Sequence, residues 1–161
     1  MAENPGAEVA GEITSQIRVL SELHDYLHQI LSDDVQQEGK SRKNGLVVAS
    51  LLENYYTAAE TIMFRIAQTF GNNIDGQRWH ADLLRRLNIE VSGVRPRLLT
   101  DDSYNDLDEL CRFRYFKRYY YRPEYDWDKL DFLTGKLSGL HPRFVQELEA
   151  FRVFAREVST G

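Results

Sequence analysis

The sequence predicts an all-α protein, an antiparallel four-helix-type bundle with an extra short helix. Apolar residues recur at three- and four-residue spacing over four long segments and one short one, which is typical of amphipathic helices. No segment shows the sustained alternation of apolar and polar residues, bounded by hairpin turns, that a half-buried strand would need. Short connections join consecutive segments, so neighbouring helices should run antiparallel.

The composition is that of one globular domain in a reducing compartment. The chain has 161 residues, of which 42% are hydrophobic and 28% are charged. The single cysteine, Cys111, cannot form an internal disulfide. No apolar run is long enough to predict a membrane span, and residues 1–11 carry acids where a secretory signal carries bases. We therefore expect a cytoplasmic protein without membrane association.

The first ten residues are expected to form a disordered lead, and the helical domain should span residues 11–158. The first helix is predicted from about Glu12 to Asp33. Two histidines in it, His24 and His28, are four residues apart and share a helix face. No acidic or cysteine partner completes a metal motif with them. They are interpreted as surface or partly buried histidines, and no metal site is predicted.

A polar loop should follow at residues 35–43, with Gly39 as its breaker and Ser41 as the cap of the next helix. That helix, over residues 44–70, has the broadest apolar stripe and is the predicted central helix. Glu60 lies beside this stripe, and two interpretations of it stay open. It is either a partly buried acid that pairs with an arginine from another helix, or a solvent-side acid.

Beyond the central helix the sequence predicts, in order, a turn, a short helix and a connector, at residues 72–76, 77–88 and 89–99. The next helix should run from Asp101 to about Tyr121, with Ser103 and Asp106 as an approximate capping box. Acids at its start and bases at its end suit the helix dipole. Pro123 should stop it.

The last helix is predicted over residues 127–158, with Asp126 as its cap. The pair His141-Pro142 falls inside this segment. Because a proline disfavours helical geometry in the residue before it, we expect a break or kink near Leu140.

The segment from Cys111 to Arg122 inverts the charge of the chain locally. The chain has a net charge of −5, but this segment contains no acid and combines six aromatic residues with five cations, Arg112, Arg114, Lys117, Arg118 and Arg122. Cations of this kind bind phosphates and the rings can stack on bases, so the segment is a candidate RNA-binding surface. The alternative is an amphipathic helix with an aromatic core face and a solvated basic face.

Local motifs of nucleotide hydrolysis, zinc catalysis and serine catalysis are absent from the sequence, namely GxGxxG, GxxxxGK[ST], HExxH and GxSxG. The neighbouring Trp79 and His80 have no serine or cysteine nucleophile with a local signature beside them. No cofactor is predicted. Any chemistry is expected to come from the basic, tyrosine-rich segment.

Several phrases, taken in order, resemble the HEPN ribonuclease toxins of the HepT type, small helical partners of minimal nucleotidyltransferases in prokaryotic toxin–antitoxin pairs. The phrases are those at residues 52–60 (LENYYTAAE), 79–84 (WHADLL), 94–96 (VRP), 107–110 (LDEL) and 125–130 (YDWDKL). The resemblance covers about residues 12–155. It implies a HEPN-like fold, a homodimer, an MNT-type nucleotidyltransferase antitoxin as partner, and RNA as the target.

The signature of this family is an arginine, four residues, a histidine, one residue and a tyrosine. The resemblance places the arginine at Arg114 and the tyrosine at Tyr121, whereas Tyr119 stands where the histidine is expected. It implies catalysis at Arg114 and Tyr119 and modification of Tyr121 with AMP. The other cations of the segment would bind RNA phosphates, and these are Arg112, Lys117, Arg118 and Arg122.

The departure at Tyr119 bears directly on catalysis. Metal-independent RNA cleavage uses the 2′-hydroxyl as nucleophile and needs a base, an acid and a cation. Histidine, with a pKa near 6.5, suits both proton transfers at neutral pH, whereas tyrosine, with a pKa near 10, is a poor base. Losing a general acid or base costs about a hundred- to ten-thousand-fold in rate.

Three interpretations follow. The first is a ribonuclease toxin, weakened by the substitution at Tyr119 and neutralised by AMP transfer. The second is a non-enzymatic adaptor subunit of a nucleotidyltransferase, with Tyr120 or Tyr121 as substrate. The third is a plain helical dimerisation module.

Helical geometry adds one expectation. In a single helix, residues seven apart project within about 20° of each other, and residues five apart project about 140° apart. Arg114, Lys117 or Arg118, and Tyr121 should therefore share a face. Tyr119 should reach this face only at the edge of a cleft or through a second subunit.

Overall fold

Helices make up most of the described chain, so the all-α prediction is confirmed. The computed structural model describes residues 3–71 and 79–160, without the side chains of residues 79–81. Its elements are α1 (Pro5–Gln29), the π-helical turn η1 (Ile30–Asp34), α2 (Val35–Glu38), α3 (Arg42–Thr69), α4 (Trp79–Leu87), α5 (Asp101–Arg118) and α6 (Trp127–Thr160). Among the described residues, β-type pairing is limited to an isolated bridge between Val91 and Arg95.

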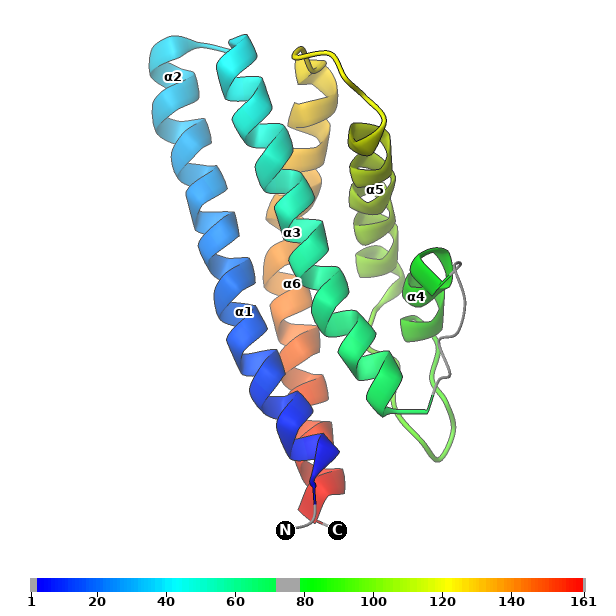
Figure 1. The fold of residues 1–161 in the computed structure, drawn as a ribbon. Coiled ribbons are helices and arrows are strands. Elements are labelled where there is room, and N and C mark those ends of the chain that lie inside the picture. Colours follow the sequence, from blue (N-terminus) through cyan, green and yellow to red (C-terminus); the bar gives the residue numbers. More distant parts are fainter. Residues whose placement is uncertain (1–2, 72–78, 161) are drawn as a thin grey trace.

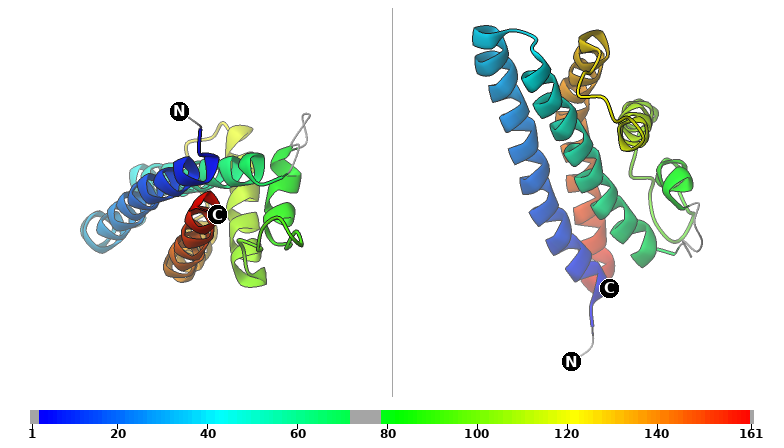
Figure 2. Two further views of the ribbon diagram at one scale, coloured as in Figure 1. Left: turned by 90° about the horizontal axis from the view of Figure 1, so that it is seen from below. Right: turned by 45° about the horizontal axis from the view of Figure 1, so that its top comes forward.

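Four helices form the predicted antiparallel bundle. In Figure 1, α1 and α5 run upward, whereas α3 and α6 run downward. Both α1 and α5 pack on α3 and on α6. Figure 2 shows that α5 is inclined to the three long helices, because α5 is seen nearly end-on where the others are seen from the side. The extra short helix, α4, packs against α3 and α5.

The helix α3 is the centre of the bundle, as the sequence predicts. It packs against α1, α4, α5 and α6, and its side chains are buried along most of its length. Tyr55 and Tyr56 are among the largest fully buried side chains. Ser41 caps the helix, since its side chain accepts a hydrogen bond from the Asn44 amide at 3.1 Å. Burial of side chains this large stabilises the fold by about 2–3 kcal/mol each.

The first helix begins at Pro5, so the expectation of a disordered lead over residues 1–10 is wrong for residues 5–10. Val9 is fully buried and Ala10 nearly so, and both belong to the core of the bundle. Their burial supplies the free energy that holds this stretch in helical form.

Small residues in this stretch reflect close packing. A Cβ added to Gly6 would lie 2.6 Å from the carbonyl oxygen of Ala155, so α1 and α6 approach each other closely there. The Asn4 side chain donates to the carbonyl of Ser159 at 3.1 Å and ties the two ends of the chain together. Both termini therefore lie at one end of the bundle, which Figure 1 shows at its lower end.

The first helix also continues past its predicted end. The elements η1 and α2 extend it to Glu38, so helical structure occupies the first part of the loop expected at residues 35–43. Val35 is partly buried against the core, and this contact favours the extension. Gly39 then ends the helix with a φ of 84°, which glycine adopts without strain.

The last helix runs without interruption through Pro142, so of the expected break or kink near Leu140 a break is excluded. A proline inside a helix costs about 3 kcal/mol or more, because it removes a backbone hydrogen bond and crowds the preceding turn. Leu140, His141 and Phe144 are all buried. The burial of these side chains outweighs the local preference of the proline.

The start of α5 is fixed by α6. Thr100 rather than Ser103 is the N-cap, and its side chain accepts a hydrogen bond from the Ser103 amide at 3.3 Å. Glu147 of α6 accepts hydrogen bonds from the Thr100 amide, at 3.2 Å, and from the Ser103 hydroxyl. Arg143 donates to the same hydroxyl at 2.8 Å. The capping of α5 is thus shared between two helices.

The remaining connections between helices lie where the sequence predicted them, in the part of the chain that the structure describes. The turn predicted at residues 72–76 lies outside the described residues. In the connector after α4, the buried Arg95 guanidinium donates to the carbonyl of Ile89 at 3.0 Å. Asp126 caps α6 as predicted, because its side chain accepts from the Asp128 amide at 2.9 Å.

Candidate functional site at the end of α5

The helix α5 ends at Arg118, three residues before its predicted end at Tyr121. Tyr119 is the C-cap, with φ −108° and ψ 8°. Pro123 disfavours helical geometry in the residue before it, and the chain leaves the helix ahead of that point. The expectation that Arg114 and Tyr121 share a helix face is therefore wrong, since Tyr121 lies beyond the helix.

Arg114 is held against the bundle by Glu60 of α3. Its Nη1 and Nη2 each donate a hydrogen bond to one carboxylate oxygen, both at 2.9 Å. The two side chains are 23% and 10% exposed. The guanidinium carbon also lies 4.7 Å from the ring centre of Tyr56. Of the two interpretations of Glu60, the structure thus shows the pair with an arginine from another helix.

Burial shapes the acid–base properties around this pair. Burial lowers the pKa of Arg114, but the hydrogen bonds and charge of Glu60 outweigh burial, so the pKa is raised overall. Burial also raises the pKa of the half-buried Cys111 thiol and of the Tyr56 hydroxyl. Both groups keep their protons at neutral pH, and neither supplies a base beside Arg114.

The five cations of the segment divide into two groups. Arg112 is 3.0 Å from Asp108, Lys117 is 3.4 Å from Glu53, and Arg114 is paired as described above. Arg118 and Arg122 are exposed and make no ion pair within the described part of the chain. A bound phosphate would meet these two guanidinium groups without first displacing a carboxylate.

The three tyrosines that follow α5 differ in exposure. The side chains of Tyr119 and Tyr121 are 59% and 88% exposed. Tyr119 contacts the ring of Tyr115 edge-on, with ring centres 5.2 Å apart. Tyr120 instead turns inward, where its hydroxyl donates to the carbonyl of Glu124. Residues 118–122, the arginine–tyrosine segment, therefore present two arginines and two tyrosines to solvent.

Three of the four histidines gather elsewhere, between α1, α3 and α6. The His141 Nδ1 is 2.9 Å from the Tyr55 hydroxyl, and its ring stacks on that of His24 with centres 4.2 Å apart. His24 and His28 approach to 3.0 Å between their Nε2 atoms. None of these three side chains contacts Arg114 or the tyrosines after α5 within the described hydrogen bonds and ring contacts.

An aromatic pocket, which the sequence did not reveal, lies beside the arginine–tyrosine segment. Its volume is about 650 Å³, and its walls come from α5, the loop that follows it and the start of α6. It is lined by Glu109, Arg112, Phe113, Phe116, Tyr120, Tyr125, Asp126, Lys129 and Leu130. The four-residue spacing of Phe116 and Tyr120 is a local signal of it, but the pocket forms only where the following loop and α6 pack against α5.

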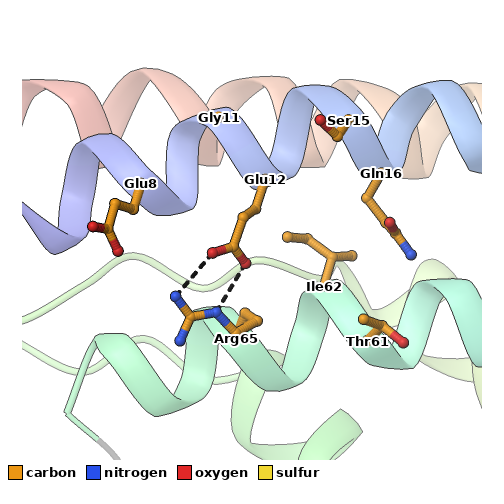
Figure 3. A pocket seen from close by; sticks show the side chains of 8 residues that line it. All are labelled: Glu8, Gly11, Glu12, Ser15, Gln16, Thr61, Ile62 and Arg65. Atoms are coloured by element: carbon orange, nitrogen blue, oxygen red, sulfur yellow. Dashed lines mark hydrogen bonds and ion pairs between the residues drawn. The ribbon is translucent and has the colours of Figure 1, made fainter.

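A second hollow, of about 450 Å³, lies between α1 and α3. Glu12 and Arg65 reach toward each other across it, as Figure 3 shows, with hydrogen bonds of 2.8 and 2.9 Å. The Glu12 carboxylate is only slightly buried, and the hydrogen bond to Arg65 lowers its pKa. The charged side chains in this hollow are therefore explained by an ion pair that joins two helices.

The described residues contain neither a cluster of metal-ligating side chains nor a membrane-spanning helix. No group of three or more metal-ligating side chains among them is arranged to hold an ion. None of the described helices combines the length and apolar character needed to cross a bilayer. The chemistry that this site offers is cationic binding, ring stacking and an exposed phenolic hydroxyl.

Comparison with known proteins identifies one family that the chain resembles over most of its length. The chain matches the family described as HepT-like protein over residues 47–155, which is more than half of its length. This region includes α4 and α5 and most of α3 and α6. No curated protein and no solved structure matched the chain. The family match establishes that this chain belongs to the HepT-like proteins.

Proposed function

We propose that this protein is the RNA-binding toxin of a toxin–antitoxin pair, neutralised by an MNT-type nucleotidyltransferase that transfers AMP to Tyr121. The observation that carries the proposal is the arginine–tyrosine segment, in which Arg118 and Arg122 are exposed, form no ion pair with any residue that the structure describes, and flank two exposed tyrosines. In a chain of net charge −5, this segment is a local site for phosphate. Membership in the HepT-like family supports the toxin role.

The proposed ribonuclease activity depends on Arg114 and Tyr119. The 2′-hydroxyl loses its proton as its oxygen bonds to the adjacent phosphorus, and the 5′-oxygen gains a proton as its bond to phosphorus breaks. Tyr119 takes part in the proton transfers, and Arg114 stabilises the charge that develops on the phosphate. With a tyrosine in place of a histidine, we expect a rate about a hundred- to ten-thousand-fold below that of a histidine-dependent enzyme.

A homodimer in the cytoplasm completes the proposal. Arg114 is engaged by Glu60, and Tyr119 projects to solvent after the end of α5. A second subunit would supply the walls that a single subunit lacks around Tyr119. Sedimentation of the purified protein over a range of concentrations should show a dimer, and a monomer at every concentration would contradict this part of the proposal.

Cleavage is tested by removing a single hydroxyl. Tyr119→Phe keeps the edge-on ring contact with Tyr115 and should abolish cleavage of a structured RNA. Tyr115→Phe is the matched control, since Tyr115 is 66% exposed and touches the same ring. Equal cleavage by the wild type and Tyr119→Phe would show that Tyr119 is not catalytic. Binding without cleavage by the wild type would exclude the ribonuclease activity.

RNA binding is tested by removing the two exposed arginines. The double variant Arg118→Ala/Arg122→Ala should bind RNA at least about tenfold more weakly and show a smaller salt dependence. The control Arg18→Ala/Arg156→Ala removes the same charge from exposed positions in α1 and α6. A similar loss in both variants would mean that net charge, rather than the arginine–tyrosine segment, governs binding.

Modification is tested by intact mass after co-expression with a nucleotidyltransferase of the MNT type. The Tyr121 oxygen bonds to the α-phosphorus of ATP, pyrophosphate leaves, and the phenolic proton passes to solvent. Mass increments of AMP should appear in the wild type and disappear in Tyr121→Phe. If the increments persist in Tyr121→Phe and disappear in Tyr119→Phe, the acceptor is Tyr119.

The second candidate is a non-enzymatic adaptor subunit of the nucleotidyltransferase. The observation that favours it is the pairing of Arg114 with Glu60, which engages the guanidinium that the cleavage mechanism would need for the phosphate. In this case the arginine–tyrosine segment would present Tyr120 or Tyr121 as a substrate. The cleavage assay above distinguishes the two functions.

A further inference from the structure

We infer that the aromatic pocket holds a nucleobase with an exocyclic amino group, belonging to a nucleotide whose phosphates bind the arginine–tyrosine segment. This inference rests on the proposed RNA binding and adds base preference to it. It is carried by the ring arrangement, the charge balance and the position of the pocket.

The rings of the pocket offer a stacking surface. Phe113 forms the floor and is 3% exposed, whereas Phe116 is 50% exposed even though Tyr120 stacks on it. Tyr125 lies on the other side, with its ring centre 5.3 Å from that of Tyr120. A base that stacks on Phe116 covers apolar surface that is otherwise in water, and such stacking stabilises binding by about 1–3 kcal/mol per base.

The charges of the pocket favour a neutral ligand. Two cations, Arg112 and Lys129, face two acids, Glu109 and Asp126. Lys129 lies 3.6 Å from Glu109, and Arg112 pairs with an acid of its own helix. Because positive and negative groups balance, the pocket offers little net attraction to a phosphate.

The acids at the rim select among neutral ligands. An ionised carboxylate only accepts hydrogen bonds, so it recognises a donor such as the amino group of adenine or cytosine. Glu109 is 35% exposed and can accept such a bond while Lys129 stays nearby. Uracil carries no amino group and can offer the carboxylate only its ring N3–H, whereas a purely apolar ligand offers it no donor.

The position of the pocket connects it with the proposed phosphate site. Tyr120 lines the pocket, and its neighbours in sequence, Tyr119 and Tyr121, are exposed at the arginine–tyrosine segment. A strand whose phosphates contact Arg118 or Arg122 can therefore insert one unpaired base into the pocket.

The test compares two short strands that cannot be cleaved. Labelled 2′-O-methyl hexamers of adenosine and of uridine lack the 2′-hydroxyl nucleophile, and their binding is followed by fluorescence anisotropy. We expect the wild type to bind the adenosine strand at least about threefold more tightly. Phe116→Leu, which removes the ring and keeps an apolar side chain, should weaken adenosine binding by about five- to tenfold.

Phe132→Leu is the matched control, because Phe132 is an exposed phenylalanine of α6, 44% exposed, that contacts Lys129 from outside the pocket. It should leave both affinities unchanged. Glu109→Gln should reduce the preference for adenosine over uridine and affect the uridine strand little. We choose Glu109 over Asp126 because Asp126 also caps α6.

The outcomes separate the pocket from the proposed function. If the wild type binds neither strand and no other RNA, the proposed RNA binding fails and the inference fails with it. If Arg118→Ala/Arg122→Ala weakens both strands but Phe116→Leu weakens neither, RNA binding stands and the pocket assignment is overturned. Free AMP, titrated in the same way, shows whether the pocket also holds a mononucleotide, and sensitivity to Phe116→Leu in either ligand supports the assignment.

Discussion

At the scale of single residues, the pair of Arg114 and Glu60 links the proposed site to the core. The sequence placed Arg114 in the motif but could not choose its partner. Glu60 and Arg114 are 54 residues apart, and their contact depends on how α3 and α5 are rotated about their axes. Periodicity in the sequence defines a helix face only to within a side chain or two. A rotation of that size determines whether an acid in α3, such as Glu60, contacts an arginine of another helix or faces solvent.

Removing Glu60 should destabilise the protein more than the removal of any surface acid. Glu60→Ala leaves the Arg114 guanidinium partly buried without its carboxylate, and we expect a loss of about 2–4 kcal/mol in the free energy of unfolding. Urea denaturation measures this loss. The control is Asp108→Ala, since its partner Arg112 has a 75% exposed side chain and such pairs contribute about 0.5 kcal/mol.

A double variant sharpens this prediction. Glu60→Leu/Arg114→Met replaces both charges with apolar side chains and should cost less stability than Glu60→Ala alone, because no unpaired charge stays buried. Equal destabilisation by Glu60→Ala and Asp108→Ala would contradict the structural role of the pair.

His141 should make the stability depend on pH. Burial, together with the charge of His24, lowers the pKa of His141 from 6.5 to about 4. Between these two pH values the unfolded chain binds a proton that the folded chain does not, so stability falls as the pH falls from about 6.5 to 4. The loss should be on the order of 2 kcal/mol. His24 has a lowered pKa as well, mainly through burial, and acts in the same direction.

The measurement is the stability difference between the wild type and His141→Gln, taken at pH 7 and at pH 4.5. Glutamine cannot titrate, so the difference should shift against the wild type at the lower pH. Other acids titrate in this range, including Glu147, whose pKa is raised by burial, but they are common to both proteins. An identical pH slope in both proteins would exclude His141 as the cause.

At the scale of elements, the observed ends of the helices differ most from the ends that the sequence predicted. The sequence located the five longer helices, yet it began the first helix too late and ended it too early, ended α5 three residues too late, and predicted a break or kink near Leu140 where α6 is continuous. For α1 and α6, tertiary packing overrode a local preference. Such contacts come from residues far away in sequence, so a local pattern does not contain them.

Two glycines of α1 should respond in opposite ways to the same substitution. Gly11→Ala places a methyl group where nothing lies within 4 Å, and alanine should stabilise the helix by about 0.5–1 kcal/mol. Gly6→Ala places it 2.6 Å from the Ala155 carbonyl oxygen, so α1 must move away from α6 and stability should fall. Thermal unfolding compares the two directly. A gain of stability in both variants would show that residues 5–10 do not pack on α6.

At the scale of the whole molecule, the sequence predicted the architecture and its central helix, while the aromatic pocket escaped it. The architecture follows from apolar stripes and short connections, which are local properties. The pocket needs α5, its following loop and α6 together, including Tyr125 and Lys129. Its shape depends on the inclination of α5, and no pattern within α5 determines that angle.

Cooperative folding should require α6. This helix contributes ten buried residues and packs on α1, α3 and α5. A chain ending at residue 126 should therefore lose its cooperative thermal transition in circular dichroism. A chain ending at residue 158 keeps nearly all of the helix and serves as the control, with a transition close to that of the full chain. A sharp transition in the shorter chain would show that the first three long helices form a unit without α6.

The contact between Asn4 and Ser159 also bears on the order in which the bundle folds during translation. These residues are 155 positions apart, so the first helix leaves the ribosome long before its partner α6 exists. At about 5–20 residues per second, the interval is roughly 8–30 s. During translation the apolar face that α1 turns toward α6 stays uncovered, and the bundle closes only after α6 has been synthesised. A ribosome that stalls before α6 would hold an open bundle, ready for a chaperone or a protease.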